Sequence, residues 1–210
     1  MRKMHIFPLI SLLMTTLVAM TSCHISGTSY DADSEKGYAE AIKLIQKNVD
    51  LTDCKIYYME FETSQPQGNK VETVTIKYVN TNDKAYSQKM LVMGAQVVRD
   101  PEPIAPTFES PVYKDVKGID LATFDSKKIA DQIAQAKKLI PKDGKYMSVY
   151  NYKIEESVPA GNEDFNSDYV KGKQSTSFQL FFSQKTPDGK PAIAEVRVIV
   201  DDNGKVKFDI

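Results

Sequence analysis

The chain contains no tryptophan, and its two histidines, His5 and His24, both lie near the start of its 210 residues. The body of the protein therefore has no histidine, and its one cysteine is Cys54. Histidine-dependent triads and the usual zinc sites are excluded, because both need imidazole or several thiolates. Without a histidine to activate it, the Cys54 thiol is expected to be buried and inert. We expect a protein without catalytic activity, metal or cofactor.

The sequence also has no large excess of one charge, since it contains 27 basic and 28 acidic residues. Removal of residues 1–22 takes away Arg2 and Lys3 and leaves 25 basic residues against 28 acidic ones. A protein that binds nucleic acid usually carries a basic stripe, and this sequence shows none. A nucleic-acid partner is therefore not expected.

The apolar run lies at the amino terminus. Basic Arg2 and Lys3 precede an apolar stretch over residues 6–20, and the small residues Thr21 and Ser22 lead into Cys23. A positively charged start, an apolar centre and small residues before the cleavage site are typical of a secretory signal peptide.

Residues Met20-Thr21-Ser22-Cys23 resemble the lipobox of bacterial lipoproteins. The resemblance implies that residues 1–22 are removed and that lipid, with acyl chains such as palmitate, is attached to Cys23. His24 stands where aspartate marks inner-membrane retention in enteric bacteria, so an outer-membrane anchor facing the periplasm or the cell surface is favoured. A simple secreted protein and an uncleaved membrane anchor stay open as alternatives.

Two helices and seven strands are predicted in the body. Apolar residues at helical spacing predict helices from Asp33-Ser34 to Asn48 and, with Asp125 as N-cap, up to Pro141. Alternating apolar residues and turn signals predict strands over 54–63, 71–80, 86–98, 146–156, 174–184, 192–200 and 205–210.

The order of a helix followed by strands occurs twice, which predicts an α+β fold of two helix-on-antiparallel-sheet units, αβββ-αββββ. The expected division is a signal peptide (1–22), a tether (23–33), a first unit (34–98), a Pro-rich linker (99–120) and a second unit (121–210). The prolines of residues 99–120 indicate either a free linker or a crossover that lies along the surface.

A helix across an antiparallel sheet, repeated, resembles the tandem PepSY-like periplasmic proteins and the β-lactamase inhibitor protein. The ending Val200-Asp201-Asp202-Asn203-Gly204-Lys205-Val206 is similar to the closing hairpin of PepSY-type domains. The resemblance implies that the protein binds or inhibits a protein partner.

Two polar motifs suggest other chemistry. Oxygen-bearing side chains alternate over 164–168, as at the start of a calcium loop, but Tyr169 and Ser175 stand where the loop needs glycine and glutamate. A polar surface loop is the favoured interpretation. Glu60 and Glu62 lie on one strand face about 7 Å apart, which leaves a carboxylate-dependent hydrolase as an alternative function.

Several apolar side chains break the alternation of their strands. If Tyr57 and Met59 face the helix, Ile56 and Tyr58 face away, and Phe181 and Ile199 likewise point to the second face of the sheet. Such side chains are either covered by the sister unit or exposed to a partner.

The sequence thus predicts a lipid-anchored envelope protein that binds a protein partner, with Tyr58, Phe181 and Ile199 as candidate partner-binding residues. A structural or accessory lipoprotein of envelope assembly is a further alternative.

Overall fold

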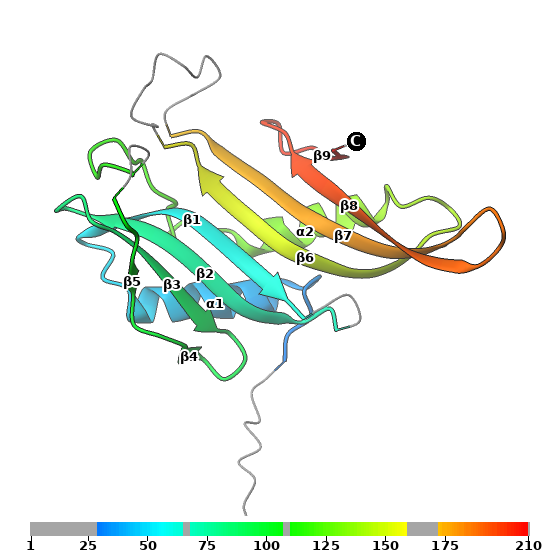
Figure 1. The fold of residues 1–210 in the computed structure, drawn as a ribbon, viewed down its shortest axis with the longest axis horizontal. Coiled ribbons are helices and arrows are strands. Elements are labelled where there is room, and N and C mark those ends of the chain that lie inside the picture. Colours follow the sequence, from blue (N-terminus) through cyan, green and yellow to red (C-terminus); the bar gives the residue numbers. More distant parts are fainter. Residues whose placement is uncertain (1–28, 65–67, 107–109, 159–171, 210) are drawn as a thin grey trace, which may run out of the picture.

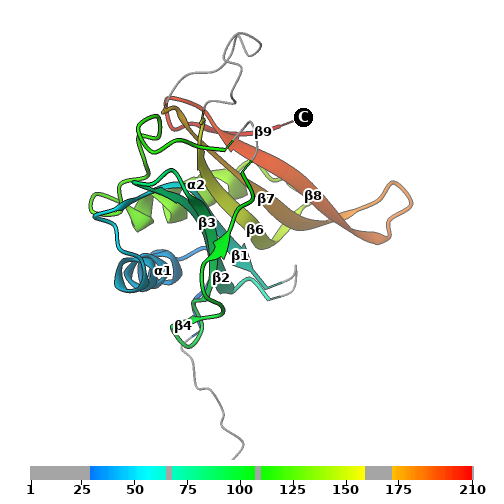
Figure 2. The same cartoon turned by 60° about the vertical axis from the view of Figure 1, so that its left-hand side comes forward.

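Two helices cover one face of a nine-stranded antiparallel sheet, which confirms the predicted α+β class (Figures 1 and 2). The structure, a computed structural model, describes residues 29–64, 68–106, 110–158 and 172–209. The helices are α1 (Glu35–Asn48) and α2 (Ser126–Lys137), which lie side by side. Within the described residues, neither helix has the length and apolar character needed to cross a membrane.

The strands run in the order β4-β3-β2-β1-β6-β7-β8-β9, and β5 pairs with β3. Their bounds are β1 Cys54–Thr63, β2 Val71–Asn80, β3 Ala85–Leu91, β4 Gln96–Val97, β5 Glu102–Pro103, β6 Lys145–Glu156, β7 Gln174–Lys185, β8 Pro191–Val200 and β9 Val206–Phe208.

Most of the predicted elements are confirmed, and Asp125 caps α2 by accepting a hydrogen bond from the backbone N–H of Lys127. The single strand predicted over 86–98 is wrong. The chain turns after β3, where Gly94 and Ala95 have φ angles of 92° and 50°, and β4 then pairs back onto β3. Such left-handed angles cannot continue a strand, and the sequence gives little warning of Ala95 in that conformation.

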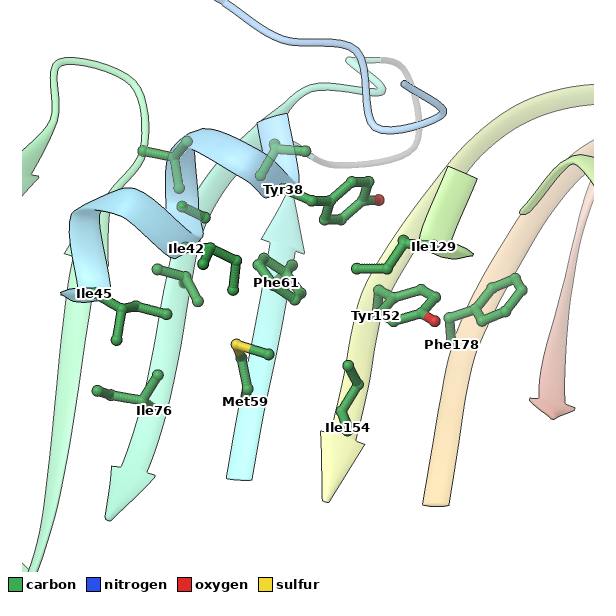
Figure 3. Close-up of a cluster of buried hydrophobic side chains, with 14 of the residues drawn as sticks. Tyr38, Ile42, Ile45, Met59, Phe61, Ile76, Ile129, Tyr152, Ile154 and Phe178 are labelled. Carbon is green, nitrogen blue, oxygen red and sulfur yellow. The ribbon is translucent and has the colours of Figure 1, made fainter. Parts of the chain in front are cut away.

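The core lies between the helices and the sheet (Figure 3). Four aromatic rings form a connected row across it, from Tyr38 on α1 through Phe61 on β1 and Tyr152 on β6 to Phe178 on β7. Tyr38 and Phe61 meet edge to face with ring centres 5.0 Å apart, and Tyr152 stacks on Phe178 at 5.3 Å. These are the geometries that aromatic pairs prefer, so each contact adds to the gain from burial.

Strands β1 and β6, which are about 90 residues apart in the chain, pair in the middle of the sheet. The register sets Met59 opposite Ile154 and Phe61 opposite Tyr152. The Thr63 hydroxyl donates a hydrogen bond to the backbone carbonyl of Val149, which strengthens the junction. Residues 30–103, the N-terminal half, and residues 121–209, the C-terminal half, therefore share one sheet.

The folded body begins before residue 33, the predicted end of the tether over 23–33. The backbone N–H of Val71 donates to the Tyr30 carbonyl at 3.0 Å, and that of Ala32 donates to the Asn69 carbonyl at 2.9 Å. Ala32 is fully buried in the core. The residues from Tyr30 onward therefore belong to the folded body, because they already pair with the start of β2.

The predicted linker, 99–120, is a crossover that lies along the surface, the second of the two alternatives. Within it, β5 pairs with β3, and Lys55 donates hydrogen bonds to the carbonyls of Tyr113 and Val116 at 3.0 and 2.8 Å. The N–H of Ile119 bonds to the Ile56 carbonyl, and the Ile119 side chain enters the core. This segment passes from the edge of the sheet to the start of α2 while attached to β1.

A buried carboxylate holds the end of this crossover. Glu156, at the end of β6, is 4% exposed and accepts hydrogen bonds from the backbone N–H groups of Lys117 and Gly118, at 2.7 and 2.6 Å. Gly118 has a φ of 93°, which favours glycine and directs its N–H to the carboxylate. Hydrogen bonds to an ionised acceptor are stronger than neutral ones, so Glu156 fixes the crossover to β6.

We predict that Glu156→Gln lowers the free energy of unfolding by about 2 kcal/mol, because an amide NH2 replaces one of the two acceptor oxygens and then faces a part-buried backbone N–H as a second donor. Glu155→Gln is the matched control. Its side chain lies on the opposite face of the same strand and forms a surface ion pair with Lys153, so its removal should cost under about 0.5 kcal/mol. Urea denaturation of both variants measures the difference. Equal losses would show that Glu156 does not fix the crossover.

Candidate functional site

One face of the sheet, here called the open face, is turned away from α1 and α2 (Figure 2). The strand registers place all three candidate partner-binding residues on this face. Tyr58 lies on β1, Phe181 on β7 and Ile199 on β8, each half-buried. None of the three belongs to the core beneath the helices. Part of this face, near the start of β1, is covered by the crossover.

A β-bulge sets the direction of the side chains at the start of β1. The register shifts between Ile56 and Tyr58, so Ile56 enters the core beneath the helices, whereas Tyr57 packs with Val79 and Val116 in a small cluster on the open face. The expectation that Tyr57 faces the helices and Ile56 faces away is therefore wrong. Strict alternation fails here because a bulge adds one residue to the strand.

Tyr58 is held in place by its neighbours. Its ring packs against the cluster of Tyr57, and the Lys77 ammonium lies 4.6 Å from the ring centre. Its hydroxyl donates to a Glu60 carboxylate oxygen at 2.7 Å. Burial, together with this hydrogen bond and the nearby glutamate charges, raises the pKa of Tyr58 well above its ordinary value. The phenol therefore stays neutral and acts as a hydrogen-bond donor.

The two carboxylates of the hydrolase alternative are engaged with other groups. Glu60 accepts the Tyr58 hydroxyl, and Glu62 accepts hydrogen bonds from Thr73 and Lys89. Burial alone would raise the pKa of Glu62, but the hydrogen bonds from Lys89 and Thr73 and the Lys89 charge outweigh it, so the pKa is lowered. A glycosidase needs one carboxyl group with a raised pKa to act as acid. The surroundings of Glu62 lower its pKa, so they do not suit it to the role of the acid.

Phe181 forms an aromatic pair that the sequence pattern did not predict. Its ring centre lies 6.3 Å from that of Tyr150 on β6, at an interplanar angle of 67°. Tyr150 precedes a register shift of β6, where Asn151 has a φ of 50°. Asparagine tolerates this left-handed conformation better than most residues, and a Tyr-Asn-Tyr run inside a strand was the available signal.

Ile199 does not extend the aromatic pair. It lies opposite Ser177 on β7 and Lys207 on β9, whereas Phe181 lies opposite Glu195, which precedes Ile199 by four residues in β8. The candidate residues therefore share one face without forming one apolar patch.

Paired charges separate these apolar side chains. Lys153 lies 3.0 Å from Glu155, Lys89 pairs with Glu62, and Arg197 lies 3.6 Å from Asp209. The open face thus presents aromatic rings within a polar surface in which charges of both signs alternate.

The remaining candidates give no further site. Burial, and next the charges of Asp50 and Asp53, raise the pKa of the half-buried Cys54 thiol, which disfavours the reactive thiolate. The lipidation candidate Cys23 and the loop over 164–168 lie outside the described residues. Among the residues that are described, no group of three His, Cys, Asp or Glu side chains is arranged to hold a metal ion.

Comparison with known proteins gives no relative: no family model, curated protein or solved structure matches this chain.

Proposed function

We propose that this protein is a lipid-anchored, noncatalytic module of the bacterial envelope that binds a protein partner on the open face of its sheet. The observation that supports this most is the set of half-buried aromatic side chains, Tyr58, Tyr150 and Phe181, on the face that no helix covers. An antiparallel sheet can expose one face to water without any function. The part of each aromatic ring that is still exposed would lose contact with water when a partner binds, and this burial would stabilise the complex.

The composition of the open face suits a partner that binds reversibly. Such interfaces are about as polar as the rest of the surface and are enriched in tyrosine, phenylalanine and arginine. Binding energy usually concentrates in a few aromatic anchors, and the surrounding charges set orientation and specificity. The Tyr150–Phe181 pair is the proposed anchor. The ion pairs of Lys153 with Glu155 and of Arg197 with Asp209 flank it.

The lipid anchor would hold this surface close to the membrane. Tyr30 is the residue whose backbone pairs with the start of β2, and seven peptide units separate it from Cys23. A fully extended chain of that length spans about 25 Å. The body therefore would lie within one domain diameter of the lipid, with an outer-membrane location favoured by His24.

The two halves would be repeats of one helix-on-sheet unit. Each begins with a helix, continues into antiparallel strands and places its first strand, β1 or β6, at the middle of the sheet. This arrangement supports the resemblance to tandem PepSY-like proteins and the β-lactamase inhibitor protein, for which a role in binding a protein partner is implied.

The binding surface is tested by placing p-benzoylphenylalanine at position 181 and illuminating the native envelope. A partner docked on the open face should be cross-linked from this position. The matched control carries the same photoreactive side chain at Gln135, which is exposed on α2, on the opposite side of the sheet. Adducts that form equally from both positions, or from position 135 alone, would exclude the open face as the binding surface.

The anchor is tested separately by intact mass measurement of the protein extracted from membranes. The expected species begins at Cys23 and carries the mass of attached acyl chains, and Cys23→Ala should leave the unprocessed precursor. A chain cleaved at another position, or one without lipid mass, would show that the leader is not a lipoprotein signal.

A further inference from the structure

A cleft of about 540 Å³ opens on the helix side of the sheet, away from the open face. It lies between the first half of α2, the segment 117–125 and the facing ends of β6 and β7. Small-molecule sites commonly have volumes of about 300–1,000 Å³, so this cleft is large enough for a compact ligand.

The floor of the cleft contains a buried polar pair with spare hydrogen-bonding capacity. Gln132 and Tyr152 are 3% and 2% exposed, and the Tyr152 hydroxyl donates to the Gln132 side-chain oxygen. Among the described residues, no acceptor receives the side-chain N–H groups of Gln132, although this side chain lines the cleft. The side-chain nitrogen of Gln132 is open to the cleft, so a ligand atom that enters the cleft could accept a hydrogen bond from it.

Apolar side chains form the walls. Ile129 from α2 and Ile154 from β6 flank Tyr152 in Figure 3, and Ile119 and Phe124 from the segment before α2 are the other apolar side chains of the lining. Thr123, Gln174 and Thr176 add neutral polar groups to the lining. Apolar walls with a small number of polar groups are the usual construction of a site for a small molecule.

Charges at the rim are balanced. Lys117 and Lys128 oppose Asp120 and Asp125, and each acid already accepts hydrogen bonds from its own loop or from the start of α2. An equal number of charges of each sign gives no net attraction for an ion, and the apolar walls would penalise a buried charge.

We propose that this cleft binds a small uncharged molecule that has an apolar body and one hydrogen-bond acceptor. The apolar body would pack on Phe124, Ile129 and Ile154, and the acceptor would receive an N–H of Gln132. This site is independent of the partner surface, because the two lie on opposite sides of the sheet.

Benzophenone is a suitable probe, since it is uncharged, consists of two apolar rings around one carbonyl acceptor and forms a covalent bond to nearby C–H groups on illumination. The full, membrane-extracted protein is labelled over a range of probe concentrations, and the labelled residues are located by mass spectrometry. Labelling should saturate and should concentrate on the peptides that contain Phe124, Ile129 and Ile154.

Two variants of α2 distinguish binding in the cleft from nonspecific binding of the probe to the protein surface. Gln132→Leu removes the donor and should raise the half-saturating concentration about tenfold, the effect of one lost hydrogen bond. Gln135→Leu makes the same change one turn away on the exposed face and should have no effect. If Gln132→Leu does not fold, Phe124→Ala, which removes one apolar wall, should weaken labelling in its place.

Benzophenone-4-carboxylate tests the charge of the ligand with the same ring system. It should label the cleft at least tenfold more weakly than benzophenone. Labelling that is scattered over the surface, that fails to saturate or that is unchanged in the tested cleft variant would overturn the proposed site. Equal or stronger labelling by the carboxylate would overturn the uncharged class of ligand. Neither result bears on cross-linking from position 181.

Discussion

The pairing of β1 with β6 is the interaction on which the rest of the structure depends. It joins strands from the two halves, and on the helix side it brings Phe61 and Tyr152 into the aromatic row that runs from Tyr38 to Phe178. The hydrogen bond from Thr63 to Val149 and the ion pair between Asp33 and Lys137, at 2.6 Å, add contacts between the same halves. Both helices therefore pack on one continuous core, and the sheet has one open face.

Each proposed site follows from this junction. The open face is continuous from β1 to β8 only because the two halves share one sheet, so Tyr58 and Phe181 lie on the same surface although 123 positions separate them. The cleft is formed on the other side, where the crossover, fixed to Ile56 and Glu156, reaches α2 beside β6. The protein could thus bind a protein partner on one side of the sheet and a small molecule on the other.

Local features of the fold could be predicted from the sequence. The bounds of β1 and β2 and the cap at Asp125 follow from alternation and capping chemistry, which act over a few residues. The bulge at Tyr57 and the left-handed conformation of Asn151 could not be predicted in this way, because both depend on how one strand is aligned with its neighbours. The pairing of β1 with β6 is likewise nonlocal. Tyr150 was missed as a result, and Gln132 was missed because it is polar, although its spacing from Ile129 and Ala136 placed it on the inner face of α2.

Native-state hydrogen exchange tests the central role of the junction most directly. The amides of β1 and β6 over residues 58–61 and 152–155 should exchange only through global unfolding, with the same free energy and denaturant dependence as the most protected amides of β2 and β7. This result is expected if the two halves unfold as one unit. Exchange of the junction amides at a lower free energy than the amides inside either half would show that the halves separate first, and the single continuous sheet would not be the unit of stability.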